Sequence, residues 1–410
     1  MLSEILKILP MLVCLFWGIA IFITLCERRK RHYGVLTLFM ANATLLYWGL
    51  SIYYNRIALL IPVSDTVYTF CNLAIYPLFL CYIKAVTTSG QNIYITIVRW
   101  MLPSFLCAVI VAWTYMYMTD EEIQIFLDSC IRRVSVDTLD GMPFRMSILH
   151  IVRRLVFVIQ IPFVIVIGLR HIRRFNRLVV SLYADTEQRS IMSIHVILYL
   201  FLGISVLSFI FNILGAKVFV SSEWIRSVPM FMFSALLYGF GYIGHRHNFS
   251  FEDIEHDIKG TTGFVDESGK VDDEQQDENI MDIVVEGDNE SAVQSNEQTS
   301  ELRQRIERLM IDEKLYLTPN LKLVDLVKML GTNRSYVYNA INREMGMSFS
   351  EYVNSLRVKY ACELMQRDPS LSIPRVAEQS GFASDVSFYR NFKLFKGGSP
   401  KDYIKTRGSL

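Results

Sequence analysis

Seven apolar runs within the first 245 residues most constrain the fold of this 410-residue chain. Each holds roughly 17–21 residues, enough for a helix to cross about 30 Å of hydrocarbon at about 1.5 Å per residue. Because a bilayer interior offers no water to backbone polar groups, such runs are expected to be helical. The approximate limits of the runs are Ile8–Cys26, Val35–Tyr54, Val67–Ile83, Trp100–Met118, Ile151–Leu169, Ile194–Leu214 and Ile225–Ile243.

Basic residues around the first run indicate the orientation of the bundle. Only Lys7 precedes that run, whereas Arg28, Arg29, Lys30 and Arg31 follow it directly. A cleaved signal peptide has the opposite order, with its positive charge before the apolar stretch. Positive charge favours the cytoplasmic side, so the N-terminus is expected outside. Seven crossings then place the C-terminal part of the chain in the cytoplasm.

Six polar side chains in or at the ends of the runs are candidates for a ligand-sensing site. The two arginines would either reach lipid headgroups at the outer interface or pair with an anionic ligand or an external carboxylate. The uncharged side chains would either bind a ligand or form hydrogen bonds between helices. The sequence leaves these alternatives open. The candidates are Arg153, Arg154, Asn72, Gln160, His195 and Asn212.

An acidic segment separates the apolar half from the rest of the chain. Phe249–Ser300 holds 16 Asp/Glu against two Lys and few large apolar residues. Such a composition buries too little surface to offset chain entropy, so we expect a disordered linker over 249–300. Residues 301–410 have the opposite balance, with 18 Lys/Arg against 12 Asp/Glu, a net charge of +6. A basic module behind an acidic tether is typical of a nucleic-acid-binding protein.

The basic module contains two helix-turn-helix patterns on either side of a long helix. In the first, Gly331 permits a sharp turn and Asn333 can begin a helix, with Ser335, Tyr338 and Asn339 on its outer side. Next comes one helix predicted over Phe349–Arg367. Polar side chains of an exposed helix suit a DNA major groove, where Asn pairs with adenine and Arg with guanine or phosphate.

The second pattern lies at Gly381–Tyr403. Ser384 can cap a helix whose apolar residues Phe388, Phe392 and Phe395 recur at spacings of four and three. We expect the side chains that lie between these apolar positions to face outward. They are Asp385, Ser387, Tyr389 and Arg390.

These two units resemble the DNA-binding domain of AraC/XylS-family transcription regulators over about 110 residues, 301–410. Two tandem matches at this separation are more specific than one isolated match. Ile404 stands where the family usually has Arg. The first unit carries Asp325, Leu326, Leu330, Gly331, Tyr336, Gly346, Ser348, Phe349, Tyr352 and Arg357. The second carries Gly381, Phe382, Ser384, Ser387, Phe388, Arg390, Phe392, Lys393, Gly397, Ser399, Pro400 and Tyr403.

The resemblance implies which residues bind double-stranded DNA. Base readers would be Ser335, Tyr338 and Asn339 in the first unit, and Asp385, Val386, Ser387, Tyr389 and Arg390 in the second. Arg334 and Lys393 join them as candidates for a guanine or phosphate contact, although a surface lysine can also be merely solvated. A homodimer is a possible assembly.

The predicted fold class is therefore all-α: a seven-helix transmembrane bundle over 1–248, an acidic disordered linker over 249–300 and a cytoplasmic domain over 301–410. The function that follows is a one-component transcription regulator in a bacterial inner membrane, controlled by an unknown small-molecule or membrane signal. A second mechanism within this interpretation is proteolytic release of the DNA-binding module. A transporter or channel with a DNA-binding tail is the alternative.

Enzymatic chemistry has no support in the sequence. The seven cysteines are scattered and have neither zinc-site nor disulfide spacing. No nucleotide-binding loop and no Ser/His/Asp arrangement is present. We therefore expect no metal, no cofactor and no catalytic residue.

Overall fold

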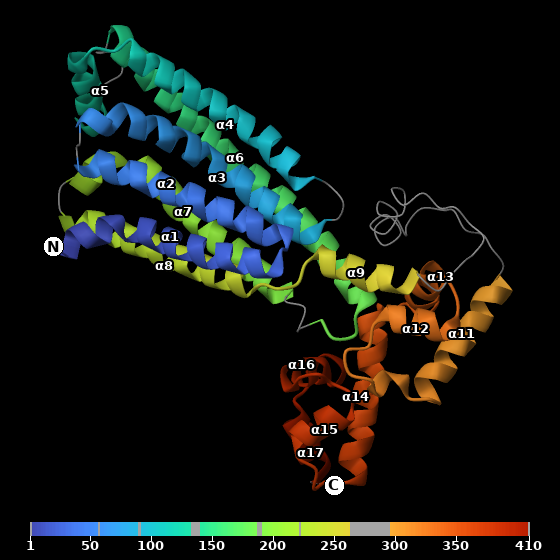
Figure 1. The fold of residues 1–410 in the computed structure, drawn as a ribbon. Helices are drawn as coiled ribbons and strands as arrows, with labels where there is room; N and C mark the ends of the chain where they lie inside the picture. Colours follow the sequence, from blue (N-terminus) through green and yellow to red (C-terminus); the bar gives the residue numbers. More distant parts are fainter. Residues whose placement is uncertain are drawn as a thin grey trace. The chain divides into compact units, whose positions relative to one another are not determined.

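The computed structural model describes residues 2–55, 58–88, 92–132, 140–186, 191–220, 223–262 and 296–408, and Figure 1 shows its helices. Within these ranges every element is a helix, which confirms the predicted all-α class. The chain divides into two compact units, one of residues 1–172 and 192–252, the other of residues 173–191 and 253–410.

The first unit is built from long apolar helices. Neighbouring helices α1 and α2, α2 and α3, and α3 and α4 pack against each other, and α8 packs against α1. The helices are α1 (Leu2–Arg28), α2 (Arg31–Asn55), η1 (Ala58–Leu60), α3 (Ile61–Thr87), α4 (Ile93–Met116), α5 (Asp120–Arg132), α6 (Gly141–Leu182), α7 (Ile191–Val220) and α8 (Glu223–Arg246).

Seven of these helices are long and apolar enough to cross a membrane. Each of them covers most or all of one apolar run, so the predicted number of spans is confirmed by length and composition. Large apolar side chains also point outward from them: Val98 and Ile159 are both 68% exposed, and Trp113 is 60% exposed. Such a surface is unfavourable in water and suits contact with hydrocarbon.

The interior of the first unit is aromatic. The rings of Phe79 and Phe201 stack with centroids 3.6 Å apart, and Tyr76 meets Phe201 edge-on at 5.4 Å. Phe39 and Phe240 lie 4.9 Å apart in the same region. These residues come from α2, α3, α7 and α8, so the cluster ties together helices that are far apart in the sequence.

Helix α5 was not predicted. It lies between α4 and α6, outside the seven apolar runs. Its first turn holds Asp120, Glu121 and Glu122, which favours a helix N-terminus. It folds because Phe126 is buried in a cluster with Val111 of α4 and other apolar residues.

The second unit contains shorter helices, the last of which closes the chain (Figure 1). Leu302, Ile306 and Met310 of its opening helix are buried. Residues 173–182, the end of α6, also belong to this unit. The other elements are α9 (Phe251–Thr262, from Asp253), α11 (Asn296–Ile311), η3 (Leu315–Leu317), α12 (Leu323–Leu330), α13 (Arg334–Asn339), η4 (Ala340–Glu344), α14 (Phe349–Arg367), α15 (Ile373–Gln379), α16 (Asp385–Lys396) and α17 (Pro400–Gly408).

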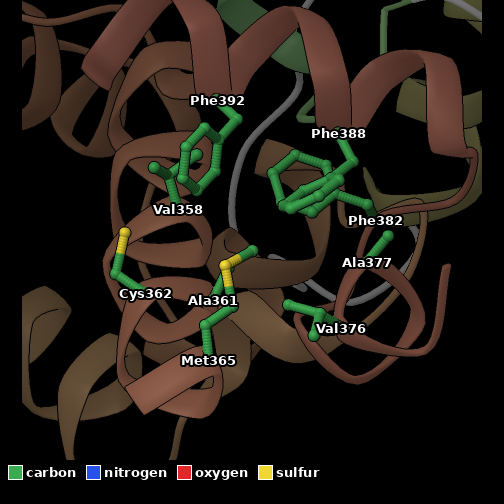
Figure 2. Close-up of a cluster of buried hydrophobic side chains, with 9 residues drawn as sticks. All are labelled: Val358, Ala361, Cys362, Met365, Val376, Ala377, Phe382, Phe388 and Phe392. Carbon is green, nitrogen blue, oxygen red and sulfur yellow. The ribbon is translucent and has the colours of Figure 1, made fainter. Parts of the chain in front are cut away.

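One hydrophobic core joins α14, α15 and α16, and Figure 2 shows its side chains converging. Ile404 of α17 packs against this core, which explains how an apolar residue fits at the position where the resembling family has Arg. The core residues are Val358, Ala361, Cys362, Met365, Val376, Ala377, Phe382, Phe388 and Phe392.

The expectation of a disordered linker over Phe249–Ser300 was wrong at both ends. Residues 251–262 form α9, and α11 begins at Asn296. Helix α9 forms because Phe251 and Ile254, three positions apart, are both buried, at 1% and 0% exposure. Averaging the composition over fifty residues hid this short amphipathic pattern. Residues 263–295 lie outside the described part of the chain.

The fifth apolar run belongs to a helix that is longer than the run itself. The sequence analysis ended this run at Leu169 and assigned residues 1–248 to the transmembrane bundle. Instead α6 continues as helix to Leu182, and residues 173–191 group with the C-terminal unit. The cause is a set of contacts that Asp185 and its neighbours make with α14, described below.

Candidate nucleic-acid interface

The first helix-turn-helix unit consists of α12, a turn and α13. Gly331 ends α12 with a φ of +59°, a left-handed conformation that favours glycine. Asn333 caps α13, because its Oδ1 accepts a hydrogen bond from the backbone N–H of Ser335 at 3.2 Å. Val337 is fully buried beneath the helix. The turn and the cap were both predicted from the sequence. Together they set the orientation of α13 relative to α12.

The four candidate DNA contacts of this unit are half-exposed. They are Arg334, Ser335, Tyr338 and Asn339. The Nη1 atom of Arg334 is buried without a hydrogen-bond partner among the described residues. Burial lowers the pKa of this guanidinium below its ordinary value. An anionic or carbonyl oxygen brought to Arg334 would therefore supply a missing hydrogen bond.

The second unit consists of α15, a turn at Gly381 and α16. Ser384 caps α16 by accepting a hydrogen bond from the backbone N–H of Ser387 at 3.2 Å. Asp385, Val386 and Arg390 are exposed, with Val386 at 70%. The exposed candidates thus lie on the first two turns of α16. A helix that enters a major groove by its N-terminal end presents these positions to the bases.

Two of the expected outward-facing residues face inward instead. Ser387 is only 3% exposed, and the side-chain amide of Asn391 donates to its hydroxyl oxygen at 3.3 Å. Tyr389 is half-buried and packs against the core of α14–α16. The sequence placed both outside because neither breaks the spacing of the phenylalanines. Ser387 is small and satisfied by Asn391, so the buried side of α16 is wider than that spacing indicates.

Lys393 and Arg390 provide positive charge on the exposed side of α16. Both side chains are solvent-exposed. Arg390 donates from Nη2 to the hydroxyl oxygen of Thr186 at 3.2 Å. The sequence did not single out Thr186, because its contact with α16 joins residues 204 positions apart.

Helix α14 joins the two helix-turn-helix units. It has 19 residues, the length predicted from the sequence. Ser348 and Glu351 form a capping box at its start, since Glu351 N–H donates to Ser348 Oγ at 3.2 Å and Ser348 N–H donates to Glu351 Oε2 at 2.9 Å. Between α13 and α14 the chain forms a π-helical turn, Ala340–Glu344.

The ligand-sensing candidates belong to the compact unit of residues 1–172 and 192–252, and they lie in different environments. Arg153 is directed to Asp65 of α3, with Nη1 3.4 Å from Oδ1, and donates to the hydroxyl of Thr69 at 3.0 Å. Arg154, its neighbour, is exposed. Of the two alternatives for the arginines, Arg153 therefore pairs with a carboxylate of this chain.

Asp65 is the centre of a polar cluster that sequence reasoning missed. Its Oδ2 accepts a hydrogen bond from the Tyr115 hydroxyl at 3.0 Å and lies 2.9 Å from His150 Nε2. With Arg153, three helices (α3, α4 and α6) meet at this carboxylate. The available signal was the presence of polar residues at the ends of neighbouring runs, but the sequence does not show which ends meet.

The remaining candidates do not join this cluster. Asn72 is 9% exposed and lines a small cavity of about 40 Å³ together with Ser205, Ser208 and aromatic side chains. The side-chain oxygen of Gln160 is buried without a partner among the described residues. His195 is half-exposed on α7. The side chain of Asn212 lies outside the described part of the structure.

The paired units and their caps define a helix-turn-helix DNA-binding domain, a class of domain found in transcription regulators. Consistent with this, a family model described as a helix-turn-helix domain matches residues 326–406. The C-terminal domain is of the AraC type of this class, which confirms the resemblance read from the sequence. The chain's apolar half lies outside the matched residues.

Known transcription regulators are similar to part of the chain. The Msm operon regulatory protein of Streptococcus mutans is 31% identical over 86 residues, 21% of this chain and 31% of that protein. The transcriptional regulatory protein YesN of Bacillus subtilis is 31% identical over 103 residues, 25% of this chain and 27% of that protein. The HTH-type transcriptional regulator YtdP of Bacillus subtilis is 30% identical over 90 residues, which are 22% of this chain and 12% of that protein.

The chain thus spans less than a third of the length of each of these relatives. No solved structure matches it significantly. The comparisons support a helix-turn-helix domain at residues 326–406.

Proposed function

We propose that this chain is a membrane-bound, one-component transcription regulator of a bacterial inner membrane, whose seven-helix unit senses a signal and whose C-terminal unit binds promoter DNA. The observation that carries the proposal is one polypeptide with both seven apolar helices long enough to span a bilayer and a tandem helix-turn-helix domain. In such a chain no separate partner is needed to pass the signal from membrane to DNA.

The proposed orientation has the N-terminus outside and the DNA-binding unit in the cytoplasm. Its support is the cluster of Arg28, Arg29, Lys30 and Arg31 between the first two spans. An odd number of crossings then brings the C-terminal unit to the side of the chromosome. The exposed apolar side chains of α4 and α6 supply the surface that lipid would cover.

The proposed DNA contacts divide into base readers and phosphate contacts. Ser335, Tyr338 and Asn339 on α13 and Asp385, Val386 and Arg390 on α16 are the base readers. Because Ser387 and Tyr389 face the core, we assign them to the support of α16 and not to the DNA surface.

Arg334 and Lys393 are the proposed phosphate or guanine contacts. Arg334 has a buried Nη1 that lacks a partner among the described residues, which DNA would supply. Lys393 is exposed and follows Arg390 on the same helix. Arginine is suited to either role because its planar fork binds guanine or phosphate with two hydrogen bonds.

The signal would act on the apolar helices of the compact unit 1–172 and 192–252. Asp65, His150 and Arg153 form a cluster linking α3 and α6, and α6 continues to Leu182. A signal that changes this cluster would act on the same helix that ends in the C-terminal unit. A homodimer is compatible with this proposal and is an outcome to be measured.

The test is selection of genomic fragments by the full-length chain reconstituted in nanodiscs. We expect enrichment of a small set of promoter fragments, with binding that weakens steeply with salt because phosphate contacts release counterions. A matched variant that carries both Asn339→Ala and Arg390→Ala should lose the enrichment while keeping its fold. Equal recovery of all fragments, or no salt dependence, would contradict the proposal. Recovery of the chain from the soluble fraction of cells would contradict its membrane part.

A further inference from the structure

A short segment after α6 is buried against the DNA-binding domain. Residues 183–186 follow the helix directly, and all four are buried. The backbone N–H of Ala184 donates to the carbonyl of Leu321 at 3.0 Å. The carbonyl of Ala184 accepts from Ser350 Oγ at 3.0 Å and from Asn354 Nδ2 at 2.9 Å. Connecting segments normally lie on the surface. These contacts show a segment docked on the start of α14.

The side chain of Asp185 enters the docking site most deeply. Its Oδ1 accepts a hydrogen bond from Arg357 Nη1 at 3.0 Å, and its Oδ2 accepts one from the backbone N–H of Asn320 at 2.9 Å. The side chains of Asp185 and Arg357 are 2% and 0% exposed. Arg357 also donates to the carbonyls of Tyr316 at 2.7 Å and Thr318 at 2.8 Å.

A buried arginine of this kind requires a counter-charge. Burial lowers the pKa of Arg357, and the negative charge of Asp185 opposes that shift. Breaking a buried ion pair leaves an uncompensated charge, which is unfavourable in a low-dielectric interior. The DNA-binding domain therefore holds a buried site for an acidic residue, and Asp185 of the segment occupies it.

A second set of contacts secures the edge of the docked segment. The hydroxyl of Tyr183 donates to Asp257 Oδ2 of α9 at 2.8 Å. Lys322, at the start of α12, donates to Asp257 Oδ1 at 2.7 Å. The carboxylate of Asp257 thus accepts hydrogen bonds both from the segment and from the residue at the start of the first helix-turn-helix unit.

The docked segment also contacts a candidate DNA reader. Thr186 Oγ1 accepts a hydrogen bond from Arg390 Nη2 at 3.2 Å. Arg390 is one of the exposed residues of α16. A guanidinium held by Thr186 has to leave that partner, in whole or in part, before it reaches a base or phosphate.

We propose that residues 183–186 are an intramolecular lock on the DNA-binding domain, anchored by Asp185 in the Arg357 site and restraining Arg390 through Thr186. This inference rests on the proposed function and adds its regulation. Release of the segment removes the hydrogen bond from Arg390 to Thr186, and DNA binding favours release. Because the coupling of two equilibria is reciprocal, docking of the segment must weaken DNA binding by the same factor by which DNA binding weakens docking.

The position of the lock in the chain explains how it would respond to a signal. Leu182 is the last residue of α6 and Tyr183 is the first of the segment, so no free loop separates them. Arg153, which pairs with Asp65, belongs to the same helix. A small shift or rotation of α6 would pull directly on the segment, whereas a flexible connection would absorb it.

The experiment compares three variants of the full-length chain in nanodiscs at one fixed salt concentration, on a promoter fragment selected as above. Thr186→Val removes the hydroxyl and keeps the shape of the side chain. Asp185→Asn removes the charge that anchors the segment. Glu363→Gln removes an exposed carboxylate from α14 and controls for the general gain in DNA affinity when negative charge is lost.

We expect Thr186→Val to bind the fragment about threefold more tightly, because one part-buried hydrogen bond to Arg390 is lost. We expect Asp185→Asn to bind roughly tenfold more tightly, because the whole segment is loosened, and Glu363→Gln to change affinity less than about twofold. Hydrogen exchange supplies a second measurement. The amide of Ala184 should exchange faster in Asp185→Asn, and also in the wild type after DNA is added, while α14 stays protected.

The outcomes separate the lock from the proposed function. Selective DNA binding that is unchanged or weaker in both lock variants, with α14 still protected, would overturn the lock and leave the regulator intact. Absence of selective binding by the wild type would overturn the proposed function itself. If Asp185→Asn loses protection in α14, Thr186→Val decides, because its substitution leaves the Arg357 ion pair in place.

Discussion

Gly381 lies so close to the backbone of Leu317 that a Cβ atom at this glycine would stand 2.6 Å from the Leu317 carbonyl oxygen and 2.7 Å from its Cα. Gly381 also has a φ of +80°, where side chains other than glycine are strained. The turn of the second helix-turn-helix unit is therefore packed against the short helix η3, which precedes the first unit. This contact couples the position of α16 to the first half of the domain.

Replacement of Gly381 should destabilise the domain more than replacement of a glycine with the same conformation in open space. Gly397 is the matched control, with a φ of +76° and, among the described residues, no atom within 4 Å of the position that a Cβ would take. We expect Gly397→Ala to cost about 1–2 kcal/mol from backbone strain. Gly381→Ala should cost roughly 1–3 kcal/mol more, as in overpacked cores. Hydrogen exchange of α14 measures both, and equal costs would contradict the role of Leu317.

The capping box at the start of α14 gives a second prediction. Ser348→Ala removes the acceptor for Glu351 N–H and one partner of the Glu351 carboxylate. The domain should lose about 1 kcal/mol, and the amides of the first turn should exchange faster. Ser348→Thr should retain most of the stability because it keeps the hydroxyl. A similar loss in both variants would show that the side chain acts by packing and not as a cap.

DNA binding should respond differently to Arg390→Ala and Lys393→Ala. Loss of a base-reading arginine is expected to cost about 1–3 kcal/mol and to relax sequence preference at one position. Loss of a phosphate-binding lysine should weaken binding to all fragments alike and reduce the salt slope by about 1. Fluorescence anisotropy at several salt concentrations, on the selected fragment and on a scrambled one, distinguishes the two. Identical effects would contradict the division of roles on α16.

The polar cluster around Asp65 predicts that substitutions of two adjacent arginines will have unequal effects on stability. Arg153→Ala leaves Asp65 without its arginine partner, and the two side chains of this pair are only 10% and 14% exposed. We expect a loss of roughly 3 kcal/mol, the low end for breaking a buried pair. Arg154 is exposed, so Arg154→Ala should change stability by less than about 0.5 kcal/mol. Thermal unfolding in nanodiscs compares them, and equal shifts would indicate that both arginines merely contact headgroups.

Local physical chemistry accounts for what the sequence predicted correctly. Run length and apolar composition indicated seven spans, since a helix must be long enough to cross hydrocarbon. Spacing, glycine and capping residues indicated the two helix-turn-helix units, because a turn at Gly331 and a cap at Asn333 depend on only a few neighbouring residues. The length of α14 followed from the same periodicity.

Short apolar patterns and small side chains were the weaker part of the sequence interpretation. Helix α9 was missed because two buried residues, Phe251 and Ile254, stand in an acidic stretch. Ser387 was placed on the wrong side of α16 because a serine carries no hydrophobic signal. Its partner Asn391 explains the burial only once both positions on the folded helix are known.

By itself the sequence determined the all-α class, the apolar spans and the tandem DNA-binding units, since each depends on residues close together in the chain. The tertiary structure decided which distant residues meet: Asp65 with Arg153, and Asp185 with Arg357. A charge can be read from a sequence, but its counter-charge depends on how helices pack. The lock on the DNA-binding domain therefore becomes visible only in the folded chain, where residues 172 positions apart form a buried ion pair.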